Sequence, residues 1–139
     1  EKEQPVDSSL PTVLIVEDNK DLCNMLKLQL EDKFNIYMAN DGVEGLKKVH
    51  LYHPDMVVTD QMMPNMDGIE ATKMIRSLDR ADAKSIPIIA MTANAFVEDM
   101  RKTKEAGMNE HLTKPVDGEK LLQVLYKYKK QEFNIKEQE

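Results

Sequence analysis

The sequence predicts an α/β fold in which helices cover both faces of a doubly wound, five-stranded parallel sheet. Short apolar segments alternate with helical patterns along the whole chain, and some of these segments are apolar throughout, as strands buried on both faces are. Parallel neighbours need crossover connections, and the helices in those crossovers cover the sheet. The expected strand order is 2-1-3-4-5.

The expected strands are short and are bounded by Pro, Gly, Asp or Asn. In chain order they cover residues 12–16, 35–38, 56–59, 86–91 and 111–113. The first, third and fourth are the apolar ones, which predicts that they lie in the interior of the sheet.

Between the strands, apolar residues recur every three or four positions, which is the spacing of one helix face. A shorter helix is expected after the second strand, and the segment 96–104 has the fewest apolar residues of the five helical patterns. The apolar stripes are Leu22, Leu26 and Leu30; Val43 and Leu46; Ala71, Ile75 and Leu78; and Leu121, Leu122, Leu125 and Tyr126.

The chain length favours one domain, because 139 residues with 41% apolar content can form one core but not two ordinary ones. We expect this domain to cover residues 12–130. Residues 1–11 have no periodicity and are expected to be a linker or tail, and residues 131–139 a charged tail or linker. The chain begins with Glu and not with Met, so we expect that it has been processed or, as we favour, cut from a longer protein.

Charge and composition exclude several classes of function. The net charge of −6 leaves no excess of Lys and Arg for binding nucleic-acid phosphates directly. No apolar run approaches the length of a membrane helix, so we expect no membrane contact by this segment. The single cysteine, Cys23, lies among apolar residues and is expected to be a buried thiol. A reducing, cytoplasmic location fits.

Reactive residues follow the expected strands. Glu17 and Asp18 follow the first strand, Asp60 the third, Thr92 the fourth and Lys114 the fifth. In open parallel sheets the binding crevice lies beyond the carboxyl ends of the strands, where the strand order reverses. The sequence therefore predicts that three carboxylates, a hydroxyl and an ammonium group converge on one pocket.

Clustered carboxylates repel one another unless a counter-charge holds them, and Mg²⁺ prefers such oxygen ligands. The cluster therefore predicts a magnesium site. Asp60 would be a carboxylate nucleophile for phosphate, Lys114 would neutralise charge on the phosphoryl oxygens, and Thr92 would donate one hydrogen bond. Taken alone, each residue has an ordinary structural explanation. Asp18 or Asn19, for example, can cap the following helix. Their joint occurrence at strand ends favours the functional interpretation.

Four motifs together resemble the response-regulator receiver family of two-component systems, over about residues 12–130. They are Val-Glu-Asp-Asn at 16–19, Asp-Gln-Met-Met-Pro-Asn-Met-Asp-Gly at 60–68, Met-Thr-Ala-Asn-Ala at 91–95 and Leu-Thr-Lys-Pro at 112–115. The resemblance implies the flavodoxin-like (βα)5 fold. It also implies a signalling domain that catalyses its own phosphorylation and does not turn over a free substrate.

By this resemblance Asp60 accepts the phosphoryl group from a histidine kinase or a histidine phosphotransfer domain. Asp18 and Asp60 would bind Mg²⁺, Glu17 would assist through metal-bound water, and the Met62 backbone carbonyl would complete the protein ligands. Lys114 would pair with the phosphoryl group, and its peptide bond to the following proline is expected to be cis.

The resemblance also implies a switch, in which Thr92 moves toward the phosphoryl group. Many receivers have Tyr or Phe three residues before the lysine, but here His111 occupies that position. It is either a half-exposed strand residue or a group that makes activation pH-sensitive. The fourth and fifth strands and the helices after them would transmit the change. Activation that produces a homodimer stays an open alternative.

The segment 92–109 resembles receivers inside hybrid sensor kinases, although a stand-alone receiver stays open. Three rival functions fit the residues less well. A phosphatase with an aspartate nucleophile would need a second acid at position 62, which is Met. In a flavodoxin-like electron carrier, the acidic loop at 17–19 would repel the FMN phosphate. A module that only binds partners would not need Asp60.

Overall fold

The sheet has five parallel strands in the order β2-β1-β3-β4-β5. This computed structural model describes residues 9–60, 68–79, 81–93 and 97–138, the last range including 97–99 and 130–138 by backbone only. The predicted fold class and strand order are confirmed. The strands are β1 (Thr12–Val16), β2 (Asn35–Ala39), β3 (Met56–Asp60), β4 (Ile88–Thr92) and β5 (Glu110–Thr113).

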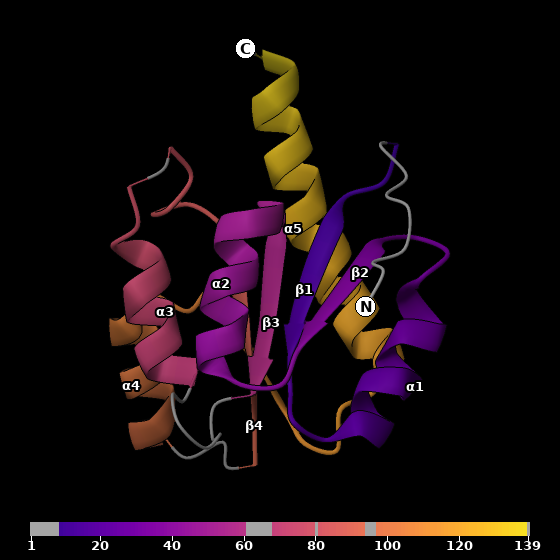
Figure 1. Cartoon of the computed structure of the whole chain (residues 1–139), viewed down its shortest axis with the longest axis vertical. Helices are drawn as coiled ribbons and strands as arrows, with labels where there is room; N and C mark the ends of the chain where they lie inside the picture. The colour runs from indigo at the N-terminus through magenta and orange to yellow at the C-terminus, as the bar shows by residue number, and fades with distance from the viewer. Residues whose placement is uncertain (1–8, 61–67, 80, 94–96, 139) are drawn as a thin grey trace.

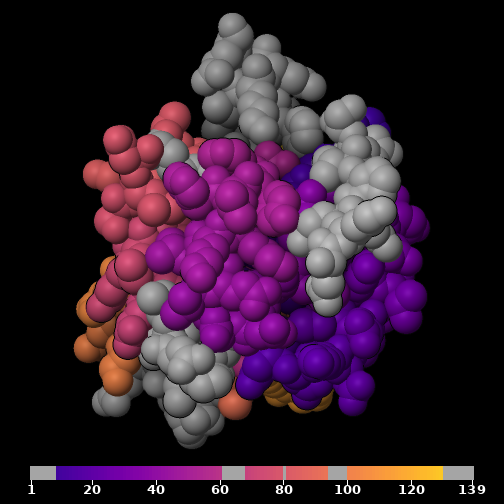
Figure 2. Space-filling view, viewed as in Figure 1, coloured from indigo at the N-terminus to yellow at the C-terminus, as the bar shows by residue number. Residues whose placement is uncertain are grey.

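Helices cover both faces of the sheet. Figure 1 shows α2 and α3 on the near side, whereas α5 passes behind the strands. In the space-filling view of the same face, the atoms of α2 cover the middle of the sheet (Figure 2). The helices are α1 (Lys20–Leu30), α2 (Gly42–Tyr52), α3 (Gly68–Arg76), α4 (Val97–Ala106) and α5 (Gly118–Gln138).

The two faces of the sheet form two separate apolar cores, because successive strand residues point in opposite directions. In β1, Val13 and Ile15 pack in one core with Leu26 of α1 and residues of α5. The alternate residues Leu14 and Val16 pack in the other core, with residues of α2 and α3. All five side chains are at most 3% exposed. Full burial of one such aliphatic side chain contributes about 1.5–3 kcal/mol.

The start of α1 is fixed by a side-chain cap. The Asn19 side chain accepts a hydrogen bond from the Leu22 N–H at 3.1 Å, which satisfies one of the free donors of the first turn. The helix therefore begins at Lys20, two residues after Asp18. This sharp transition from strand to helix holds both carboxylates at the edge of the sheet.

Helix α2 differs from the expected helix in which residues it buries. Val43 was expected on the buried side, but it is 40% exposed, and the buried positions are Gly42, Gly45 and Val49. The reason is close packing on β1, since a Cβ at Gly45 would lie 2.9 Å from Val16 Cγ2. Glycine permits this approach of helix to strand.

The fourth strand begins at Ile88 and not, as expected, at residue 86. The Ile86 N–H is bound to the Asp82 carbonyl in a turn at 2.8 Å, and Pro87 has no N–H to donate. Only the Pro87 carbonyl takes part in the sheet, where it accepts from the Val57 N–H at 2.9 Å.

The last helix continues through the charged segment that we expected to be a tail. Helix α5 runs to Gln138, and Figure 1 shows it projecting beyond the other elements. Residues 119–139 contain neither Gly nor Pro and consist largely of good helix formers. The domain boundary near residue 130 stays a prediction. Among the described residues, no helix is long and apolar enough to cross a membrane.

Candidate functional site

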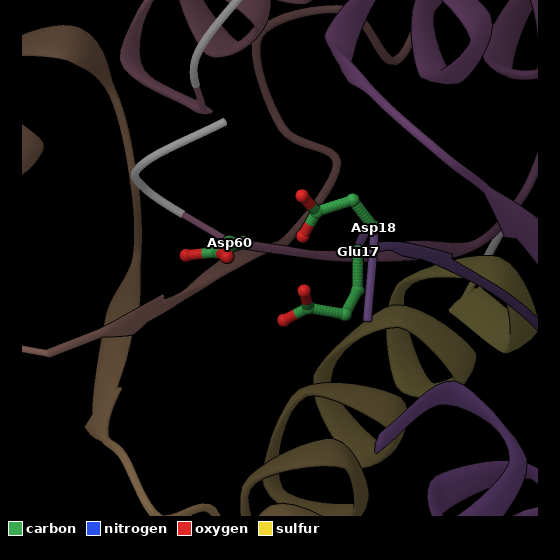
Figure 3. A group of neighbouring side chains, drawn as sticks. All are labelled: Glu17, Asp18 and Asp60. Atoms are coloured by element: carbon green, nitrogen blue, oxygen red, sulfur yellow. The ribbon is translucent and has the colours of Figure 1, made fainter. Parts of the chain in front are cut away.

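Three carboxylates meet at the carboxyl end of the sheet. Glu17 and Asp18 follow β1, and Asp60 is the last residue of the neighbouring strand β3. One oxygen atom of each lies within 4.8 Å of the others, and Figure 3 shows Glu17 and Asp18 directed toward the side where Asp60 lies. Glu17 is only 1% exposed and Asp60 6%, whereas Asp18 is exposed. The predicted convergence of these three residues is therefore observed.

The Lys114 ammonium group binds two of these carboxylates. Its Nζ donates to Glu17 Oε1 at 2.8 Å and to Asp60 Oδ2 at 3.0 Å. Lys114 follows β5 directly, and its N–H donates to the Thr92 carbonyl at 2.7 Å. The peptide bond from Lys114 to Pro115 is cis, as expected. With three carboxylates and one ammonium group, the cluster has an excess of two negative charges.

The clustering changes the acidity of the buried groups. Burial raises the pKa of Glu17 above its ordinary value, although hydrogen bonds from Lys114 and the Asn19 N–H act in the opposite direction. The carboxylates of Asp18 and Asp60 add to this rise. Burial alone would lower the pKa of Lys114, but its hydrogen bonds to Glu17 and Asp60 outweigh burial and raise it. Lys114 therefore stays charged.

Thr92 is the last residue of β4 and is 5% exposed. In the sheet register Asp60 is opposite Met91, so Thr92 lies one residue beyond Asp60 toward the crevice. Thr92 also pairs with Thr113, the residue before Lys114. The expected hydroxyl therefore stands at the same sheet edge as the carboxylates.

Two neighbours of the cluster, Asn19 and Cys23, contact Glu17, although the sequence indicated only a helix cap and a buried thiol. Asn19 was treated as a helix cap, but its N–H also donates to Glu17 Oε2 at 3.0 Å and so fixes that carboxylate. Cys23 is buried, as expected, and its thiol lies 3.3 Å from the Glu17 carbonyl oxygen. Burial, followed by the charges of Glu17 and Asp18, raises the pKa of Cys23 to about 11, so the thiol stays protonated.

Of the two remaining expected site residues, the structure describes only His111. His111 lies on β5 opposite Ala90 and lines a pocket beside α4. Met62, whose carbonyl was expected as a metal ligand, lies outside the described residues.

Comparison with known proteins identifies the family. The family model described as "Response regulator receiver domain" matches residues 13–126. The chain belongs to this family. The receiver domain is also similar to the chemotaxis protein CheY4 of Vibrio cholerae, with a TM-score of 0.80 and 30% identity over 86% of this chain and 98% of that one.

Sensor kinases are among its relatives. The Sensor protein GacS of Pseudomonas syringae is 34% identical to this chain over 89% of the chain's length. The matched segment makes up 14% of the length of GacS. The receiver domain of the sensor histidine kinase PA1611 of Pseudomonas aeruginosa, described with a magnesium ion coordinated in its active site cleft, has a TM-score of 0.77 and 29% identity over 86% of this chain and 97% of that one. This receiver domain spans 7% to 16% of the length of four kinase relatives.

Proposed function

We propose that Asp60 of this receiver domain accepts a phosphoryl group from a phosphohistidine of a histidine kinase or of a histidine phosphotransfer domain. The observation that supports Asp60 as the acceptor is its position. Its buried carboxylate ends the central strand β3, lies within 4.8 Å of two further carboxylates, and has the Lys114 ammonium 3.0 Å from Oδ2.

In the proposed transfer, a carboxylate oxygen of Asp60 attacks phosphorus, and the bond between phosphorus and the imidazole nitrogen breaks. The imidazole leaves with the electron pair of that bond. The Lys114 ammonium, already bound to the Asp60 carboxylate, stabilises the negative charge on the phosphoryl oxygens. The domain thereby promotes its own modification and is not an enzyme that turns over a free substrate.

We propose Mg²⁺ as the cofactor, because the donor set fits a hard divalent cation. The cluster offers three carboxylates and has an excess of two negative charges. Asp18 and Asp60 would be direct ligands, whereas both oxygens of Glu17 already accept hydrogen bonds, which favours a contact through water. The Met62 carbonyl is proposed from the resemblance alone. When bound, Mg²⁺ would offset the negative charge of the phosphoryl oxygens.

We propose that Thr92 and His111 form the switch. A phosphoryl group on Asp60 adds strong acceptors close to Thr92, and a new hydrogen bond to its hydroxyl would pull on the segment after β4. His111 lies beside α4 and would follow that movement. If His111 makes activation pH-sensitive, His111→Tyr should flatten the pH profile of the phosphorylation-induced change. An unchanged profile would leave His111 with a packing role only.

For the whole protein we propose a cytoplasmic phosphorelay component, with this receiver as one part of a hybrid histidine kinase. Its similarity to short stretches of sensor kinases supports this assignment. We expect no direct nucleic-acid binding, because the net charge is −6.

Sedimentation with and without phosphorylation tests for an activation-dependent homodimer.

The first experiment is intact-protein mass spectrometry after incubation with acetyl phosphate and Mg²⁺. We expect one phosphoryl adduct in the wild type, none with EDTA, and none in Asp60→Asn. Asp32→Asn is the matched control, since Asp32 is exposed and distant in sequence from the cluster. An adduct that persists in Asp60→Asn would place the acceptor elsewhere. A folded wild type that accepts phosphate from neither acetyl phosphate nor a phosphorylated kinase would favour a module that only binds partners.

A further inference from the structure

A closed ring of contacts links Glu17 to the first turn of α1. The Asn19 N–H donates to Glu17 Oε2 at 3.0 Å, and the Asn19 side chain accepts from the Leu22 N–H at 3.1 Å. The Asn19 carbonyl accepts from the Cys23 N–H at 3.0 Å, and the Cys23 thiol lies 3.3 Å from the Glu17 carbonyl oxygen. Asn19 thus takes part in three of the four contacts that connect the strand end to the helix.

The buried Glu17 carboxylate is held by two donors from different parts of the fold. Its Oε2 accepts from the Asn19 N–H, whereas its Oε1 accepts from the Lys114 ammonium at 2.8 Å. The main chain of Glu17 is fixed as well, because its N–H donates to the Ala39 carbonyl of β2 at 2.9 Å. Lys114 alone would fix one oxygen and leave the carboxylate free to rotate about that contact, so the second donor sets its orientation.

The donor on Asn19 is a backbone group whose position depends on the Asn19 side chain. Asn19 has the extended backbone of a helix cap, with φ −79° and ψ 108°, and its side chain ties this backbone to the first turn of α1. The side chain is exposed and belongs to neither apolar core. Without the cap, the first turn can fray and the N–H of residue 19 can bond to water instead.

Asp18 lies between these two fixed residues. Glu17 is held on one side of it and Asn19 on the other, so the Asp18 main chain has little freedom. One oxygen of Asp18, one of Glu17 and one of Asp60 lie within 4.8 Å of one another, and Figure 3 shows the first two directed toward the side where Asp60 lies. Groups that orient metal ligands commonly affect metal affinity about as strongly as 10–100-fold.

We propose that Asn19 is a positioning residue for the cation site. By capping α1 it holds Glu17 and Asp18 in the arrangement that binds Mg²⁺, so the carboxylates need less ordering when the ion arrives. This inference rests on the proposed Mg²⁺ cofactor. The alternative is that Lys114 places the carboxylates by itself and that Asn19 only stabilises the helix.

A matched pair of helix caps separates these two roles. Asn19→Ala removes the cap, whereas Asn19→Ser retains a side-chain oxygen that can accept from the first turn. The control is Asp41, the cap of α2, whose side chain accepts from the Glu44 N–H at 2.9 Å and does not belong to the carboxylate cluster. Asp41→Asn and Asp41→Ala remove the same charge, but only the alanine variant removes the cap. Circular dichroism verifies that all four variants are folded.

The affinity for Mg²⁺ is measured by titration with the metal alone, followed through the NMR signals of the Asp18 and Thr92 amides. We expect the Kd of Asn19→Ala to be about ten-fold higher than that of the wild type, and Asn19→Ser to restore most of the loss. The two Asp41 variants should have equal Kd values. An unchanged Kd in Asn19→Ala, no rescue by serine, or a comparable difference between the two Asp41 variants would overturn the proposal.

The metal-free protein tests the cause of this effect. In Asn19→Ala we expect faster solvent exchange of the residue 19 amide and a shifted carboxyl carbon signal of Glu17, both restored in Asn19→Ser. Unchanged signals in Asn19→Ala would contradict the proposed hold on Glu17. A wild type that binds no Mg²⁺ would refute the proposed cofactor, and this inference with it. A wild type and Asn19→Ala that bind Mg²⁺ equally well would refute this inference alone.

Discussion

The Lys114 Nζ lies 3.0 Å from Asp60 Oδ2 and so links the end of β5 to the end of β3 across the intervening strand β4. The same ammonium group lies 2.8 Å from Glu17 Oε1, a carboxylate that is 1% exposed. Lys114 is therefore the cation that offsets carboxylate repulsion in this cluster, and its removal should affect both stability and signalling.

We expect Lys114→Ala to lower the free energy of unfolding without Mg²⁺ by about 1–3 kcal/mol, because it leaves the buried Glu17 carboxylate without its cation and Oε1 without this donor. Mg²⁺ should restore part of the loss. Thermal unfolding measures both effects. Lys127→Ala is the control, since Lys127 forms a surface ion pair with Glu110 at 3.4 Å, worth about 0–1 kcal/mol, and otherwise lies over the Tyr128 ring at 5.4 Å from its centroid. Equal losses in the two variants would contradict the proposed balance of charges.

The signalling effect of Lys114→Ala should differ from that of Asp60→Asn. Asp60 and the carboxylates near it remain, so much of the phosphorylation should persist. The response at Thr92 should be lost, because Lys114 no longer holds the phosphoryl group. Mass spectrometry gives the extent of phosphorylation, and NMR of the residues around Thr92 gives the response. A variant that is phosphorylated and responds normally would show that Lys114 acts on stability alone.

Binding of Mg²⁺ to the cluster should be visible as a stability change. At a concentration of 100 times its Kd, a ligand raises the free energy of unfolding by about 2.7 kcal/mol. Asp18→Asn should lose this gain and, without Mg²⁺, should be as stable as the wild type or slightly more so, because one repelling charge is removed. Asp32→Asn should keep the gain. Thermal unfolding with Mg²⁺ and with EDTA compares them, and a full Mg²⁺ gain in Asp18→Asn would exclude Asp18 as a ligand.

The sequence predicted the sheet order and the position of each strand-end residue, because buried parallel strands and helix caps depend on local patterns. It did not predict the partners of Arg76, which contacts the carbonyls of Ala83 and Ile86 in the loop after α3 and the more distant carbonyl of Gly107. Such contacts depend on tertiary packing and leave no periodic signal. For the same reason the pocket beside α4 could not be inferred before the segments that form it were placed together.

Arg76 is expected to be a major determinant of stability. Its guanidinium makes five hydrogen bonds to α4, β4 and β5 neighbours, and burial lowers its pKa. Arg76→Gln should cost about 2–4 kcal/mol, since several buried acceptors lose their donor. Arg76→Lys should recover only part, because one ammonium cannot reach all of them. Urea unfolding measures the losses against Lys73→Gln, an exposed change on the same helix; similar losses in all three would refute this role.

Tyr128 should make stability depend on pH in the alkaline range. Its hydroxyl lies 2.8 Å from Glu110 Oε2 and 3.1 Å from the Asn109 carbonyl oxygen, and burial together with Glu110 raises its pKa from 10 to about 12. The folded state thus favours the neutral hydroxyl. Its stabilising effect is complete below pH 10, where the unfolded tyrosine is also neutral, and is lost as the pH rises toward 12.

Tyr128→Phe should therefore be less stable than the wild type by about 0.5–1.5 kcal/mol at pH 8, and the difference should shrink between pH 10 and 12. Cys23 also titrates near pH 11, but it is present in both proteins and cancels in the comparison. Tyr126→Phe is the control, since the Tyr126 ring packs 5.7 Å from Phe34 and its hydroxyl has no hydrogen bond among the described residues. Urea unfolding at each pH gives the free energies. A difference between Tyr128→Phe and the wild type that stays constant up to pH 12 would mean that the Tyr128 hydroxyl does not titrate differently in the folded and unfolded states.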